Sequence, residues 1–162
     1  GSQGGPLDHV IAAKAVAFRE AASPEFSTYA QDVVSNAAAL AEALAGHGFR
    51  MVSGGTDNHL MLVDLRPFDA DLSGKKARLI LDRAGISLNE NTVPGDERPP
   101  YITSGLRIGA PAVTTQGMGH REMREIAFQI HRVLTHRDDD GVIAEARDEV
   151  ANLCSKFAPY PD

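Results

Sequence analysis

The spacing of apolar residues along the chain predicts five helices. Apolar positions recur every three or four residues, which is typical of a helix with one buried face. The predicted helices cover residues 7–18, 24–46, 73–84, 120–134 and 138–157. Ser23 and Ser73 are favourable N-caps, and the aspartates at 138–140 favour the start of the last helix, because anions are stabilised there.

Short apolar runs between these helices predict strands. Residues 49–52 and 86–88 are expected to form brief strands. The nearly continuous apolar run at 59–65 is typical of a central strand, buried on both faces. Residues 89–100 contain three prolines and show neither helical nor strand periodicity, so a long loop is expected there.

The order of these elements indicates the fold class. Two helices come first, and a small sheet is then interleaved with, and followed by, further helices. This order predicts an α+β fold, with a largely antiparallel sheet of three or four strands and helices packed on one face. The first helix is expected to be an appendage, with an apolar face at Leu7, Val10 and Ile11 that suits docking on another domain.

Arg107 is the strongest candidate for a binding residue. Ile102 and Thr103 favour extended backbone, so a short strand is expected to lead to Arg107. This arginine lies between Gly105 and Gly109, where another backbone or a ligand can approach closely. A planar guanidinium suits a carboxylate held by two hydrogen bonds. The residues alone leave two interpretations open: a carboxylate-binding arginine, or a surface arginine on an edge strand.

Composition and charge narrow the possible functions. The chain has 162 residues and a net charge of −6, which argues against a nucleic-acid or anionic membrane partner. No apolar run approaches the ~20 residues that cross a bilayer. The one cysteine, Cys154, excludes an internal disulfide, fits a cytoplasmic location and is expected to be a small core residue. His120, His131 and His136 lack metal-ligand spacing, so no metal site is predicted.

Four motifs in order give the chain a family resemblance. They are Gln-Gly-Gly-Pro at 3–6, Val-Ser-Gly-Gly-Thr-Asp-Asn-His at 52–59, Asn-Glu-Asn-Thr-Val-Pro at 89–94 and Thr-Ser-Gly-Leu-Arg-Ile-Gly at 103–109. Together they resemble the C-terminal portion of serine hydroxymethyltransferase, in register from residue 1 to about Tyr160. The resemblance implies the C-terminal domain of a fold-type I pyridoxal-phosphate-dependent transferase. The sequence departs from the family at Gly95, where Asn is usual, and at Asp8, where Met is usual.

The resemblance assigns roles to four residues. Arg107 matches the arginine that binds the substrate carboxylate, and Asn91 matches an asparagine that hydrogen-bonds the folate. Gly4 and Gly5 match a glycine turn that reaches the pyridoxal-phosphate phosphate of the neighbouring subunit. The implied reaction interconverts serine and glycine and transfers one carbon to tetrahydrofolate. A shared site implies a homodimer, and a tetramer is also possible.

The family's Schiff-base lysine is not expected in this chain. The lysines of this chain are all predicted to lie on helices, and none has the threonine-rich sequence that surrounds the Schiff-base lysine in the family. They are Lys14, Lys75, Lys76 and Lys156. The chain alone is therefore expected to be inactive. Residues 1–22 are assigned to a glycine turn and linking helix that belong with the large domain, and residues 23–162 to the small α+β domain. The alternative is a free-standing α+β module that binds an amino acid without catalysis.

Overall fold

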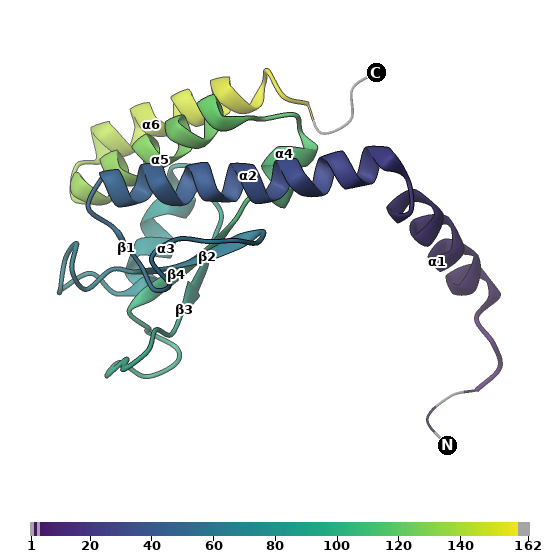
Figure 1. The fold of residues 1–162 in the computed structure, drawn as a ribbon. Helices are drawn as coiled ribbons and strands as arrows, with labels where there is room; N and C mark the ends of the chain where they lie inside the picture. The colour runs from purple at the N-terminus through teal and green to yellow at the C-terminus, as the bar shows by residue number, and fades with distance from the viewer. Residues whose placement is uncertain (1, 3, 159–162) are drawn as a thin grey trace.

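A computed structural model describes residue 2 and residues 4–158. In this part of the chain, two long helices precede a small sheet, and three further helices follow the sheet's last strand (Figure 1). The helices are α1 (Asp8–Ala21), α2 (Pro24–Gly46), α3 (Gly74–Arg83), α4 (Pro111–Thr115), α5 (His120–Thr135) and α6 (Asp140–Cys154). The strands are β1 (Arg50–Met51), β2 (Leu60–Asp64), β3 (Asn89–Asn91) and β4 (Gly105–Gly109). Gln3 and Tyr160, at the ends of the resemblance, lie outside the described residues.

The four strands form one antiparallel sheet in the order β1-β2-β4-β3. β2 and β4 are therefore the inner strands, as expected for the apolar run at 59–65. Arg107 pairs with Leu62 on one side and with Asn89 on the other. The α+β prediction with a small antiparallel sheet is confirmed.

One face of the sheet is covered by helices. Met61, Val63, Leu106 and Ile108 alternate along the inner strands and are buried. They join one hydrophobic core with side chains of α2, α3 and α5. This core is the main source of stability, because burial of apolar surface contributes most of the favourable free energy of folding. The opposite, outer face of the sheet carries Arg107, which is exposed.

α1 extends away from this core (Figure 1). None of its residues is buried. Its apolar side chains Leu7, Ile11, Val16 and Phe18 are between 53% and 71% exposed. The division of the chain at residue 22 agrees with this shape but remains a prediction.

The sequence misplaced two strand segments. No strand forms at 86–88; Ile86 and Leu88 pack against the core from a turn, and β3 begins at Asn89, inside the predicted loop. β3 is a polar edge strand, so its position is set by pairing with β4 and not by its own composition. The short helix α4 was also not predicted.

Ile102 and Thr103 are not extended. Their backbone N–H groups both donate to the carbonyl oxygen of Pro99, which closes a turn before β4. Thr103 has φ 58°, a left-handed conformation that is strained for a β-branched residue. A Cβ on Gly74 would collide with the Thr103 hydroxyl and the Gly105 carbonyl oxygen, so this turn and the start of α3 are tightly packed.

One burial prediction was wrong. Cys154 is exposed, because it is the last residue of α6, whereas the buried residues of that helix, Ile143 and Ala146, lie nearer its start. Phe26, in the first turn of α2, is exposed, because the first turns of this helix extend beyond the core and its buried stripe begins at Val33.

Candidate functional site

The outer face of the sheet positions Arg107. Its neighbours Leu106 and Ile108 point into the core, so strand alternation directs Arg107 to the opposite face. Among the described residues, its guanidinium has no hydrogen-bond or ion-pair partner. Arg107 lies on an inner strand of a folded sheet, which excludes the edge-strand interpretation. The site therefore presents a fixed backbone and a free cation, which suits capture of an anion.

Asn91 lies on the same face as Arg107. It pairs with Gly105, two residues before Arg107, so the two side chains are diagonal neighbours on adjacent strands. Its amide group donates to the carbonyl oxygen of Thr92 at 2.8 Å, which leaves the side-chain oxygen free to accept. The structure thus brings together two residues that the sequence predicted separately.

A loop of residues 92–104 folds over part of the outer face beside Arg107. A Cβ on Gly105 would collide with the side chain of Val93, so the glycine allows the loop to lie against the sheet. Val93 is 5% exposed. The loop therefore forms a fixed wall next to the arginine.

Asp96 organises this loop. Its carboxylate accepts from the backbone N–H of Val93, Arg98 and Ser104, and from the Ser104 hydroxyl at 2.7 Å. Burial alone would raise the pKa of Asp96, but these hydrogen bonds outweigh burial and lower it. The carboxylate is therefore ionised near neutral pH and bonds both ends of the loop.

Arg98 attaches the same loop to the segment before α3. Its guanidinium donates to the carbonyl oxygens of Ala70 and Leu72, at 2.6 and 3.1 Å, and to the Ser104 hydroxyl. The contacts use several donors of one planar group, which a lysine could not reproduce.

A buried carboxylate supports the sheet beneath the loop. Asp64 is fully buried and lies on the outer face, opposite Gly105. It is ion-paired with Arg50 and Arg66. Burial raises its pKa, but the hydrogen bonds from Arg66 and Arg50 prevail and lower it to about 2. Asp64 was missed in the sequence, although an ionisable residue within an apolar strand is itself a signal, because such a group needs partners when buried.

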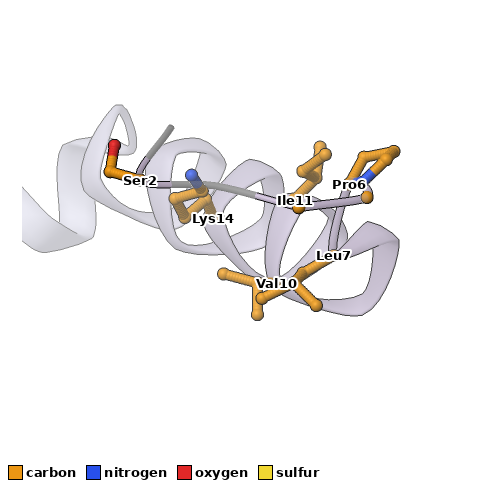
Figure 2. Close-up of a pocket in the computed structure, with 8 residues that line it drawn as sticks. Ser2, Pro6, Leu7, Val10, Ile11 and Lys14 are labelled. Carbon is orange, nitrogen blue, oxygen red and sulfur yellow. The ribbon is translucent and has the colours of Figure 1, made fainter.

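Gly4 and Gly5 are not brought near Arg107. They precede α1, which projects from the core, and a Cβ on either would meet nothing within 4 Å. Figure 2 shows the pocket between this segment and the first turns of α1, which is lined by Pro6, Leu7, Val10, Ile11 and Lys14 among others. The two glycines therefore present exposed backbone that is open to another chain.

The lysines occupy exposed positions. Lys14 lies on α1 and Lys75 and Lys76 in the first turn of α3, as predicted. Lys156 lies in a turn just past the end of α6, so its helical assignment was wrong. All are typical of solvated lysines, whose ammonium groups favour water.

The described residues contain no group of three histidine, cysteine, aspartate or glutamate side chains that could hold a metal ion. Nor is any helix within residues 4–158 long and apolar enough to cross a membrane. His131 instead stacks on His47, with ring centroids 4.6 Å apart and ring planes 16° from parallel. This pair joins α5 to the end of α2 and is remote in the sequence from the Arg107 strand.

The fold agrees with one class of protein. In the described residues, six helices and a small four-stranded antiparallel sheet, in this order, fit the C-terminal domain of a fold-type I pyridoxal-phosphate enzyme. A comparison with protein families narrows this class. The family model described as serine hydroxymethyltransferase matches residues 1–130, so the chain belongs to the serine hydroxymethyltransferase family. The match includes Gly4, Gly5, Asn91 and Arg107, and ends within α5.

Proposed function

We propose that this chain is the C-terminal part of a serine hydroxymethyltransferase and supplies the substrate-carboxylate and folate contacts of its active site. The observation that carries this proposal is the position of Arg107 on an inner strand of the sheet, exposed and with no hydrogen-bond or ion-pair partner in the part of the chain that the structure describes. An enzyme of this kind interconverts serine and glycine and transfers a one-carbon unit to tetrahydrofolate. We place it in the cytoplasm, as a homodimer or higher assembly.

Arg107 orients the substrate. Its guanidinium donates two parallel hydrogen bonds to the carboxylate of serine or glycine. The strand holds the guanidinium in place, so the substrate loses its rotational freedom when it binds. This entropy loss therefore does not add to the barrier of the reaction step. Arg107 contributes positioning and charge, because a guanidinium offers hydrogen-bond donors and no acceptor.

Asn91 recognises the folate. Its free side-chain oxygen accepts a hydrogen bond from the pterin ring, and the bond to Thr92 fixes the orientation of the amide. Asn91 and Arg107 lie diagonally on one face, so the one-carbon acceptor and the amino acid are held side by side.

Pyridoxal phosphate fits this chain only through its phosphate group. The exposed backbone of Gly4 and Gly5 has no Cβ to obstruct an anion, which suits N–H donation to a phosphate. The projecting position of this segment fits the site of a neighbouring subunit. When bound, the cofactor supplies an electron sink at the substrate α-carbon. The lysine that anchors it belongs to the N-terminal part of the enzyme, and this chain alone is inactive.

The first test is complementation. The chain is co-expressed with the N-terminal part of a serine hydroxymethyltransferase, and serine-to-glycine conversion is assayed with pyridoxal phosphate and tetrahydrofolate. Arg107→Ala should lower kcat/KM for serine by at least about 100-fold, because the carboxylate loses a charge-assisted bidentate partner. Arg83→Ala removes an equal charge from an exposed ion pair with Asp140 and should leave the rate unchanged.

Near-normal kinetics of the Arg107→Ala enzyme would contradict the proposal. The alternative, a binding module without catalysis, predicts that the isolated chain binds glycine or serine without cofactor. Calorimetry on the isolated chain distinguishes the two: the proposed fragment should show no such binding.

A further inference from the structure

Arg66 joins the sheet to the loop that follows Asn91. It comes two residues after Asp64 and donates to that carboxylate through Nε at 3.0 Å and through Nη2 at 2.7 Å. The same guanidinium donates to the carbonyl oxygens of Pro94 and Gly95, at 3.1 and 2.8 Å. One planar group therefore binds a buried carboxylate and two adjacent loop carbonyls.

The carboxylate makes this contact rigid. Asp64 is fully buried, and its backbone is paired with both β1 and β4. Its side chain has the cations Arg50 and Arg66 as partners, and its oxygen also accepts from the backbone N–H of Arg66 at 3.0 Å. Since the buried Asp64 carboxylate would lose hydrogen bonds and a cation partner if Arg66 turned away, Arg66 is held in one orientation.

The loop needs such a restraint at Gly95. This residue has φ 66°, a left-handed conformation that glycine adopts at little cost. With glycine at this position, the open or unfolded loop has more accessible conformations than it would have with any other residue there. Asparagine is the other residue that tolerates this conformation. The hydrogen bond from Arg66 to the carbonyl oxygen of Gly95 therefore restrains a backbone that glycine leaves flexible.

Loop and folate contact are linked through Asn91. Its amide donates to the carbonyl oxygen of Thr92, which lies two residues before Pro94. A shift of the loop backbone at Pro94 and Gly95 would therefore rotate the Asn91 amide away from the orientation that it has beside Arg107.

We propose that Arg66 is a positioning residue for the folate substrate: it fixes residues 92–96 against the sheet and thereby sets the affinity for tetrahydrofolate. This inference rests on the proposed function, because it assumes that Asn91 contacts the pterin ring. Arg66 itself touches neither substrate.

The loop restraint is tested on this chain without any enzyme assay. Arg66→Lys keeps the charge beside Asp64 but loses the fork that bridges carboxylate and carbonyls. Backbone amide exchange, measured by NMR, should be at least about fivefold faster at Asp96 and Arg98 in the variant, because the loop opens more often. Arg83→Lys, at an exposed ion pair, should leave these rates unchanged. Unchanged exchange in Arg66→Lys would overturn the proposal.

The functional link is tested in the complemented enzyme. Arg66→Lys should raise KM for tetrahydrofolate by about tenfold, the scale expected for losing a charge-assisted hydrogen bond, with KM for serine within twofold of wild type. Adding Gly95→Asn should recover part of the loss, since asparagine restricts the loop in the same conformation. If Arg66→Lys only destabilised the protein, KM for tetrahydrofolate would not rise more than KM for serine. Gly95→Asn would then not restore KM for tetrahydrofolate.

The two proposals fail in different ways. If Arg107→Ala loses activity as expected but Arg66→Lys leaves KM for tetrahydrofolate unchanged, the role of Arg66 is overturned and the proposed function stands. If Arg107→Ala retains normal activity, the proposed function fails, and the exchange result still decides whether Arg66 restrains the loop.

Discussion

Gly74, the first residue of α3, is a position where one added methyl group should disturb the candidate site. Gly74→Ala would drive a Cβ into the Thr103 hydroxyl and the Gly105 carbonyl oxygen. We expect a loss of about 1–3 kcal/mol in the free energy of unfolding, the usual cost of overpacking. Urea unfolding of the purified chain measures this change.

Gly46→Ala is the matched control for this substitution. A Cβ there meets nothing within 4 Å, and the residue ends α2. Alanine is a better helix former than glycine, so stability should stay constant or rise by up to about 1 kcal/mol. Equal effects of the two substitutions would show that the contact around Thr103 is not tight.

His131 should make the stability of the chain depend on pH. Burial of its ring, and repulsion from His47 and His136, lower the pKa of the imidazole. The unfolded chain then binds this proton more tightly than the folded chain, so the free energy of unfolding falls as the pH drops below about 6.5. Urea midpoints at pH 7.5 and 5.5 measure the drop.

His131→Phe should reduce this pH dependence. Phenylalanine keeps an aromatic ring against His47 but cannot bind a proton. His9→Gln, on the exposed face of α1, is the control and should leave the drop between the two pH values as in wild type. A wild-type drop in the His131→Phe chain would assign the pH dependence to another group.

At the scale of residues, the sequence predicted the candidate binding residues but not the residues that hold them in place. Arg107 and Asn91 could be proposed from motifs, because those residues lie within contiguous conspicuous segments. Asp64, Arg66 and Asp96 act through hydrogen bonds to residues distant in the chain, such as Ser104 and Gly95. Spacing carries no information on such contacts, which appear only when the loop is folded over the sheet.

At the scale of elements, α1 is expected to be dispensable for the fold of the rest. None of the residues described in the segment 1–22, residues 2 and 4–22, is buried. When this segment is deleted, the Tm should therefore change by only a few degrees, while self-association should decrease, because an exposed apolar face is lost. Thermal unfolding and sedimentation of the shortened chain measure these effects.

Truncation at the other end provides the comparison. A chain that stops before α6 loses the buried side chains Ile143 and Ala146 and should unfold at a clearly lower temperature. If deletion of residues 1–22 lowered the Tm as much, α1 would be part of the core domain and the division at residue 22 would be wrong.

The elements themselves differed in how well the sequence predicted them. Long helices with an apolar stripe and a cap, such as α2 after Ser23 and α3 after Ser73, were predicted correctly, because their signals are local. β3 and the turn at Thr103 were not. Three polar residues become a strand only through pairing with β4, and tertiary packing forces Thr103 out of the extended conformation that it prefers.

At the scale of the whole molecule, the candidate site is divided between two places. Arg107 and Asn91 share the outer face of the sheet, whereas Gly4 and Gly5 lie beyond the far end of a projecting helix (Figure 1). Such separation fits a protein whose active site is completed by other polypeptide segments. The proposed dimer accounts for the projecting helix and for the distance of the glycines from Arg107, since Gly4 and Gly5 of one subunit would reach the site of the other.

The strand order has a consequence for how the protein is synthesised. Within residues 4–158, β4 is the last strand, yet it lies between β2 and β3 and pairs with both. On the ribosome, β1 and β2 can pair early, but β3 has no partner until residue 109 has been made. From Asp64, the last residue of β2, to Gly109, the last residue of β4, the free edge of β2 has no partner strand, and unpaired strand edges are prone to misassociate. The sheet positions of Asn91 and Arg107 therefore depend on the same late strand, because β3 pairs only with β4.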